Sequence, residues 1–279
     1  MNILIQWLEP AFMQRALMAI LLATPMFGLL GSTVVASRMA FFSDALGHGA
    51  FAALAFSLLL GLRIPVPVAT LIFSIVFALI ISFVRQSSRA SSDTVIGVFA
   101  SLSAAAGLLI LSYFGNFSRY AHALTGDILT ISYADIYALA VLFVVVLFVW
   151  GHQVNRNFLV QIDEGLASSY GINPFVSGLI FALLLASLVA FSINWVGVLL
   201  LNAMLILPAA ASRILSRNLR MYHWLSVVFA TSGGILGLMI SYYANLNTTA
   251  SIIMVCGIFY LLALIYASIV SRPNKTSFH

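Results

Sequence analysis

Long apolar segments separated by short polar gaps follow one another along almost the whole chain. A helix needs about 20 apolar residues to cross the hydrocarbon core of a bilayer. Nine segments approach this length, near residues 12–36, 39–60, 65–84, 94–115, 133–151, 174–193, 195–212, 223–243 and 248–270. The sixth and seventh segments almost adjoin, so residues 174–212 form either two full spans or one broken span. The pattern predicts an all-α, polytopic membrane helix bundle with about 8–9 transmembrane helices.

Composition leads to the same class of protein. Of the 279 residues, 63% are hydrophobic and 7% are charged, whereas about a quarter are charged in soluble domains. A soluble fold could not bury so many apolar side chains, so the expected solvent is the bilayer. We expect a single transmembrane domain over 1–279, in which residues 1–10 form an amphipathic lead-in without the features of a removable signal peptide. The lone Cys256 excludes a disulfide framework.

The basic residues predict the orientation in the membrane. Cytoplasmic gaps of membrane proteins carry an excess of Lys and Arg. With nine spans, most basic residues fall on one side, which should be cytoplasmic: Arg38, Arg85, Arg89, Arg156, Arg213, Arg217, Arg220, Arg272 and Lys275. The gap over 152–173 and the tail over 271–279 are then cytoplasmic. This topology explains the net charge of +5, so the charge does not indicate a nucleic-acid partner.

Two polar gaps and one set of small residues have features of their own. Residues 116–132, on the outer side, include Asp127 and are apolar enough to lie along the membrane surface. In the inner gap, Asp163 and Glu164 suit the first turn of a short helix that Gly171 would end; an ordinary polar connector is the alternative. Glycines inside the spans predict close helix packing: Gly28, Gly31, Gly233, Gly234 and Gly237.

Asp44 and His48 are the polar residues that lie deepest in an apolar segment. Four residues apart, they share one face of a helix. A buried pair that only locks two helices together is the structural alternative, but an apolar pair would pack there at a lower desolvation cost. Carboxylate and imidazole groups together suit zinc, manganese or iron(II). Two ligands are too few for a closed site, so a second copy of the chain would have to complete it.

Signatures of enzymes are absent from the sequence. There is no H-E-x-x-H, no G-x-S-x-G and no G-x-x-x-x-G-K-[ST] motif. We therefore expect no catalytic residues, and an energised transporter would need its ATPase on another chain. The other histidines are predicted at membrane edges, on the outer segment or in the tail: His122, His152, His223 and His279.

Four stretches resemble the membrane permeases of the zinc, manganese and iron ABC importers, the ABC-3 type metal permeases. They are G-L-L-G…R-M-A-F-F-S-D-A-L-G-H over 28–48, D-T-V-I-G over 93–97, G-D-I-L over 126–129, and V-G-V-L-L…I-L-P-A-A-A-S-R over 196–213. The resemblance covers about residues 12–268. Two departures stand out, since Thr125 replaces a frequent Phe, and the His that many zinc-type relatives carry after Gly97 is missing.

The resemblance implies a function and its parts. Two permeases would form the pore of an importer in the bacterial inner or plasma membrane, with cytoplasmic ABC ATPase subunits and an extracytoplasmic metal-binding protein as partners. Asp44 and His48 would contact the transported zinc, or manganese or iron, with no permanent cofactor. The coupling helix would span about 163–173, with Asp163, Glu164, Ala167 and Gly171 contacting the ATPase. The rival interpretation is a self-contained secondary transporter in which Asp44 and His48 relay protons or metal.

Overall fold

The structure, a computed structural model, describes residues 6–59, 66–88, 90–114 and 126–270. Over these ranges the chain forms helices and turns and no strand, which confirms the all-α prediction. The long helices are α2 (Ala11–Ala36), α3 (Ala40–Leu59), α4 (Val66–Ser87), α5 (Ser92–Tyr113), α7 (Tyr133–Ile162), α9 (Pro174–Leu215), α10 (Leu219–Ala244) and α11 (Thr248–Val270). The short helices are η1 (Ile128–Thr130) and α8 (Glu164–Ser169). The predicted tail 271–279 and half of the predicted lead-in lie outside the described residues.

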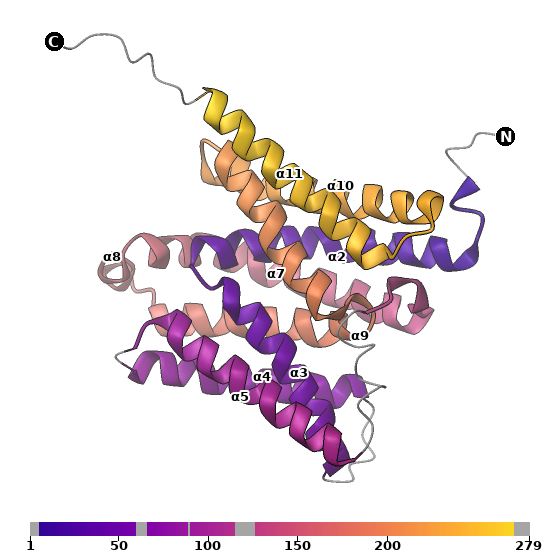
Figure 1. The fold of residues 1–279 in the computed structure, drawn as a ribbon. Helices are drawn as coiled ribbons and strands as arrows, with labels where there is room; N and C mark the ends of the chain where they lie inside the picture. The colour runs from indigo at the N-terminus through magenta and orange to yellow at the C-terminus, as the bar shows by residue number, and fades with distance from the viewer. Residues whose placement is uncertain (1–5, 60–65, 89, 115–125, 271–279) are drawn as a thin grey trace.

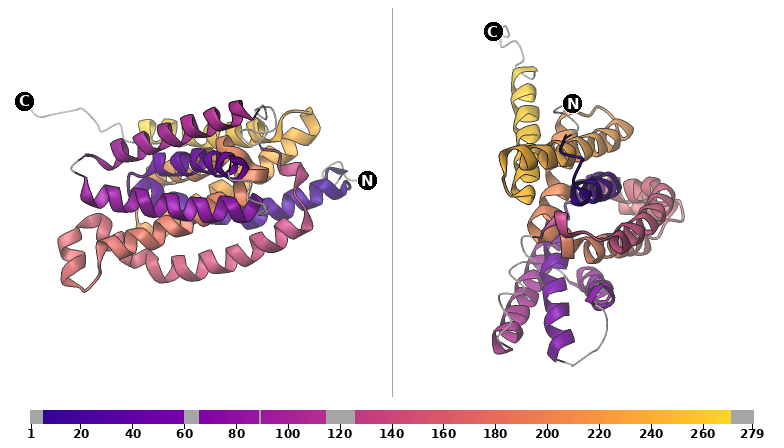
Figure 2. Two further views of the ribbon diagram at one scale, coloured as in Figure 1. Left: turned by 90° about the horizontal axis from the view of Figure 1, so that it is seen from below. Right: turned by 90° about the vertical axis from the view of Figure 1, so that its right-hand side faces the viewer.

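The arginine-bearing connections gather at one end of the bundle (Figures 1 and 2), which we call the inner end. The α2–α3, α4–α5 and α9–α10 connections lie there, together with α8 and the last turn of α11. The start of α2, η1 and the α10–α11 connection lie at the opposite, outer end. This is the distribution that the charge count predicts. That the inner end faces the cytoplasm stays a prediction.

The broken helix α9 lies at the centre of the bundle, where it contacts α2, α3, α4, α7, α10 and α11. The break is at Gly197, whose φ of 76° and ψ of 160° only glycine adopts readily. The chain runs to the outer end before Gly197 and returns toward the inner end after it (Figure 1). The break therefore brings the second arm of α9 back through the middle of the bundle.

The described residues contain seven helices that are long and apolar enough to cross a membrane, so the predicted count of eight to nine was slightly high. One reason is that the segments predicted over 174–193 and 195–212 form one element, α9, with a break at Gly197. Helix α3 (Ala40–Leu59) follows the predicted span 39–60. The class of fold, a polytopic membrane helix bundle, is confirmed.

Helix α7 continues beyond its predicted span. A capping box between Ser132 and Asp135 begins it, and it ends only at Ile162. Gln153 and Asn157 lie on its buried face, with relative exposures of 3% and 8%, because α2 and α9 pack against this part of the helix. Residues 152–162 of the predicted inner gap are therefore helical, and the connector between α7 and α9 is confined to 163–173.

The segment before α7 enters the bundle at its outer end. Asp127 begins η1 by accepting a hydrogen bond from the backbone N–H of Leu129 at 3.0 Å. Ile128 is 2% exposed, and η1 contacts α2 and α9. Residues 126–132 therefore pack against the outer end of the bundle, and their predicted position along the membrane surface stays a prediction; residues 116–125 lie outside the described part.

Three glycines of α2 and α10 lie where helices meet backbone to backbone, while Gly233 and Gly234 face side chains of neighbouring helices. A Cβ added at Gly28 would lie 2.7 Å from the Cα of Val227 in α10. A Cβ at Gly31 would overlap the carbonyl oxygen of Leu205 in α9, and one at Gly237 would overlap the Cα of Ile252 in α11. The predicted packing role of these glycines is confirmed, since any side chain would force the helices apart.

Candidate metal-binding site

Asp44 and His48 lie on one face of α3, near its beginning at the inner end. The helix starts after a sharp junction in which Arg38 has a φ of 54° and the N–H of Met39 bonds the carbonyl of Val34. The Nε2 atom of His48 lies 3.7 Å from the Oδ2 atom of Asp44, and the two side chains are 30% and 40% exposed. The predicted pairing is therefore present, and one protomer leaves both side chains partly open.

Asn202 on the second arm of α9 is the third polar residue at this position. Its Nδ2 atom donates a hydrogen bond of 2.7 Å to the Oδ1 atom of Asp44. Its own Oδ1 atom is buried without a hydrogen-bond partner in the structure, which is uncommon for a buried amide. Sequence reasoning assigned Asn202 no role, although an amide within an apolar run was the available signal.

A glycine allows α3 to approach α9 at this site. A Cβ at Gly47 would lie 2.7 Å from the Cγ1 atom of Val198. Val198 and Asn202 are four residues apart on α9 and therefore share one face of that helix, as Asp44 and His48 do on α3. These two faces of the antiparallel helices pack against each other. The small residue at 47 therefore brings Asn202 within hydrogen-bonding distance of Asp44.

The arrangement offers a carboxylate, an imidazole and an amide oxygen from two helices. Among the described residues, no cluster of three or more His, Cys, Asp or Glu side chains is present. One protomer thus offers three donors, fewer than the four of a closed tetrahedral site. Oxygen donors next to a single imidazole suit manganese or iron(II) at least as well as zinc.

The remaining predicted histidines do not join this site. His223, predicted at a membrane edge, is instead 9% exposed on α10, with its Nδ1 atom 2.6 Å from the Oγ atom of Ser32. Its ring also stands edge-on to Trp150 and stacks on Tyr222. His152 is exposed on α7, and His122 and His279 lie outside the described residues.

The predicted short helix over 163–171 forms as α8 and protrudes at the inner end (Figure 1). The Oδ1 atom of Asp163 accepts a hydrogen bond from the backbone N–H of Leu166, and Glu164 occupies the first turn. At the other end the N–H groups of Gly171 and Ile172 bond the carbonyls of Ser168 and Ala167, both at 3.0 Å. Gly171 has a φ of 74°, as this type of helix end requires.

Ala167 and the other residues predicted for ATPase coupling divide into two groups. Ala167 is fully buried, so its side chain anchors α8 to the bundle. Asp163, Glu164 and Gly171 are exposed. The exposed surface of α8 also includes Leu166 and Tyr170 at its C-cap, while the buried Ala167 holds the helix in place.

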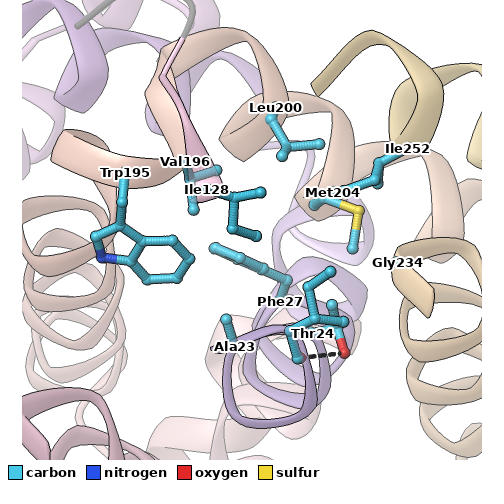
Figure 3. A pocket seen from close by; sticks show the side chains of 11 residues that line it. Ala23, Thr24, Phe27, Ile128, Trp195, Val196, Leu200, Met204, Gly234 and Ile252 are labelled. Carbon is cyan, nitrogen blue, oxygen red and sulfur yellow. Dashed lines mark hydrogen bonds between the residues drawn. The ribbon is translucent and has the colours of Figure 1, made fainter. Parts of the chain in front are cut away.

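A separate small cavity lies toward the outer end (Figure 3). Its volume is about 10 Å³, and Ile128 of η1 points into it beside Trp195 and Phe27. Its lining carries no titratable side chain, and the one polar side chain, Thr24, bonds the carbonyl of Ile20 in its own helix. This cavity is a packing feature that holds η1 against the break in α9, not a binding site.

Comparison with known proteins identifies relatives over nearly the whole chain. The family described as the ABC 3 transport family matches residues 9–267. The manganese transport system membrane protein MntC of Listeria monocytogenes is 28% identical over 260 residues, covering 93% of this chain and 92% of the relative. The high-affinity zinc uptake system membrane protein ZnuB of Buchnera aphidicola is 28% identical over 241 residues, covering 85% and 90%.

Two further relatives extend the comparison. A probable iron transport system membrane protein of Haemophilus influenzae is 25% identical over 266 residues, covering 95% of this chain and 97% of the relative. Among solved structures, a chain of PsaBC from Streptococcus pneumoniae in complex with Fab superposes with a TM-score of 0.79 and 25% identity, covering 92% of both chains. The fold and the sequence therefore indicate the same group of proteins.

Proposed function

The chain belongs to the ABC 3 transport family, and on that premise we propose that it is the membrane permease subunit of an ATP-binding-cassette importer for a divalent transition metal. The observation that carries the proposal is the Asp44–His48 pair, which lies inside a polytopic bundle and is contacted by Asn202. Ionisable residues at such positions mark ion pathways because their desolvation is costly. Relatives named for manganese, zinc and iron transport support the class of substrate.

Manganese is our first candidate for the ion, ahead of zinc. The site holds oxygen donors from Asp44 and Asn202 next to the single imidazole of His48, and carboxylate and carbonyl oxygens are ligands that suit manganese. From the sequence alone zinc is the first candidate, and the contact of Asn202 with Asp44 reverses that order. The described part of the site contains no thiolate, the soft ligand that would favour zinc over manganese.

The transport cycle requires partners that supply what this chain lacks. A second permease brings another Asp44–His48–Asn202 set, and the two sets together can surround an ion. ATP hydrolysis takes place on separate cytoplasmic subunits, since this chain has no phosphate-binding loop motif. An extracytoplasmic protein delivers the metal to the outer end. The permease itself is no enzyme, and its role is to alternate access to the site.

Uptake measurements in cells that depend on this transporter test the function. We expect accumulation of radioactive manganese, with weaker accumulation of zinc and iron, and we expect uptake to stop when cellular ATP is depleted. A transporter that keeps its full rate without ATP, but loses it when the proton gradient is collapsed, would be a secondary transporter, and the importer proposal would then fail.

Changes in α8 test the coupling role of the inner connector. Asp163→Ala removes the helix cap, worth about 1 kcal/mol, and Gly171→Ala forces a residue with a Cβ into a left-handed conformation, at roughly 1–2 kcal/mol. We expect the double variant to lose most of the metal-stimulated ATP hydrolysis in the reconstituted importer while still binding metal. Gly151→Ala on α7, where a Cβ meets open space, is the matched control and should behave as wild type. Wild-type hydrolysis in the double variant would contradict the coupling role.

A further inference from the structure

A polar cavity of about 550 Å³ opens at the inner end of the bundle, away from the Asp44–His48 pair. Three arginines from different parts of the chain line it. Arg38 lies in the α2–α3 connection, Arg85 in the last turn of α4 and Arg213 in the last turn of α9. The only carboxylate in the lining is that of Glu164 on α8. The cavity therefore concentrates positive charge from three elements around one space.

These three guanidinium groups lack a carboxylate partner within the described residues. Arg85 donates to the Oγ atom of Ser92 at 3.2 Å and weakly to the Sδ atom of Met39 at 3.5 Å. Arg213 donates to the backbone carbonyl of Val35 at 3.3 Å. Across the described part of the chain, the ion pair within 4.0 Å is that of Asp44 with His48. The arginines thus keep most of their donors available to a ligand.

The shape and charge of the cavity suit one kind of ligand. Arginine matches carboxylate and phosphate groups through paired N–H donors. A carboxylate offers two oxygens in one plane. Inorganic phosphate or a phosphomonoester offers three or four oxygens in a tetrahedral array that can accept from three separate arginines, and the phosphodiester of a lipid headgroup offers two unesterified oxygens that can each accept more than one N–H. Ser92, which also lines the cavity, begins the 22-residue helix α5, whose N-terminal N–H groups favour an anion as well. Two acidic side chains, Asp93 and Glu164, offset part of the charge but do not cancel it.

We propose that this cavity is a phosphate-binding site formed by Arg38, Arg85 and Arg213. The phosphate group can come from a phospholipid headgroup of the inner leaflet or from a soluble phosphate. A neighbouring cavity of about 440 Å³ shares Arg85 and continues beside Phe175 and Leu179 of α9, where Phe83 is half-exposed and contacts Phe175. Apolar side chains next to the arginines give a lipid's acyl chains a surface to lie on. The proposal does not depend on which ion is transported.

Binding measurements on the full chain in detergent test this site. Native mass spectrometry counts retained phosphatidylglycerol against diacylglycerol, which lacks the phosphate group, and thermal unfolding in inorganic phosphate against chloride at equal ionic strength reports a soluble ligand. The cavity variant is Arg38→Gln/Arg85→Gln/Arg213→Gln. The control, Arg156→Gln/Arg217→Gln/Arg220→Gln, removes the same charge from exposed positions outside the lining of the cavity.

We expect wild type and control to bind phosphatidylglycerol or phosphate, and the cavity variant to bind at least about tenfold more weakly, because each lost donor to a charged group weakens binding severalfold or more. If the triple variant does not fold, Arg38→Gln alone, at an exposed position, should lower the affinity by roughly threefold or more. Loss with phosphatidylglycerol alone identifies a lipid, and loss with inorganic phosphate alone identifies a soluble ligand. Equal weakening in cavity and control variants, or no preference for either phosphate source in wild type, would overturn the proposal.

Discussion

Replacing Asp44 with alanine is expected to abolish metal uptake while the permease still assembles. The carboxylate would be the one anionic ligand of the proposed site, and it accepts the hydrogen bond of Asn202 at 2.7 Å. Even loss of a group that only positions a metal ligand costs 10- to 100-fold in affinity or activity, so loss of the ligand itself should lower uptake by at least about 100-fold. His48→Ala should have a similar effect, because it removes the one imidazole.

Neighbouring substitutions separate the role of the site from effects on folding. Asn202→Ala removes a group that orients Asp44 and should lower uptake by roughly 10-fold. Ser43→Ala is the control, since the hydroxyl of Ser43 bonds the carbonyl of Ala40 in its own helix and lies off the Asp44–His48 face; uptake should stay at the wild-type rate. The assay is radioactive manganese uptake, normalised to the amount of permease that copurifies with its ATPase. Wild-type uptake by both Asp44→Ala and His48→Ala would refute the site.

Adding one methyl group at Gly31 or Gly237 is expected to destabilise the bundle strongly. A Cβ at Gly31 would overlap the backbone oxygen of Leu205, and a Cβ at Gly237 would overlap the Cα of Ile252. Overpacking typically costs 1–3 kcal/mol. Backbone atoms cannot rotate away as a side chain can, so we expect about 3 kcal/mol at each position. The measurement is the thermal unfolding midpoint of the purified permease in detergent.

Gly257→Ala on α11 is the matched control for these two variants. A Cβ at this position meets nothing within 4 Å. Alanine favours a helix interior over glycine by about 1 kcal/mol, so the unfolding midpoint should stay unchanged or rise. If Gly31→Ala, Gly237→Ala and Gly257→Ala lower the midpoint equally, the close contacts of α2 with α9 and of α10 with α11 do not limit stability.

The proposed metal site at Asp44 and the glycine contacts at Gly31 are connected through α9. The close approach of α2 to α9 at Gly31 holds the second arm of α9 in the middle of the bundle, and that arm carries Asn202 to Asp44. A variant that loosens this packing should therefore also weaken the site. Glycine substitutions that reduce uptake beyond their effect on the amount of folded protein would reveal this connection.

The sequence by itself determined the class of fold, the membrane location, the Asp44–His48 pair and the short helix that Asp163 begins and Gly171 ends. Each of these depends on residues close together in the chain. Apolar length reports a membrane span, a spacing of four places two side chains on one helix face, and cap residues act within a few positions of themselves.

Only the tertiary structure decided that Asn202 donates to Asp44, that η1 enters the bundle and that α9 breaks at Gly197. Asp44 and Asn202 are 158 residues apart in sequence. Their contact requires the two helices to pack closely, which is possible because Gly47 leaves room for the side chain of Val198. The three arginines of the inner cavity likewise come from separate connections. Contacts between distant segments depend on how helices pack against one another, and no local pattern in the chain encodes that packing.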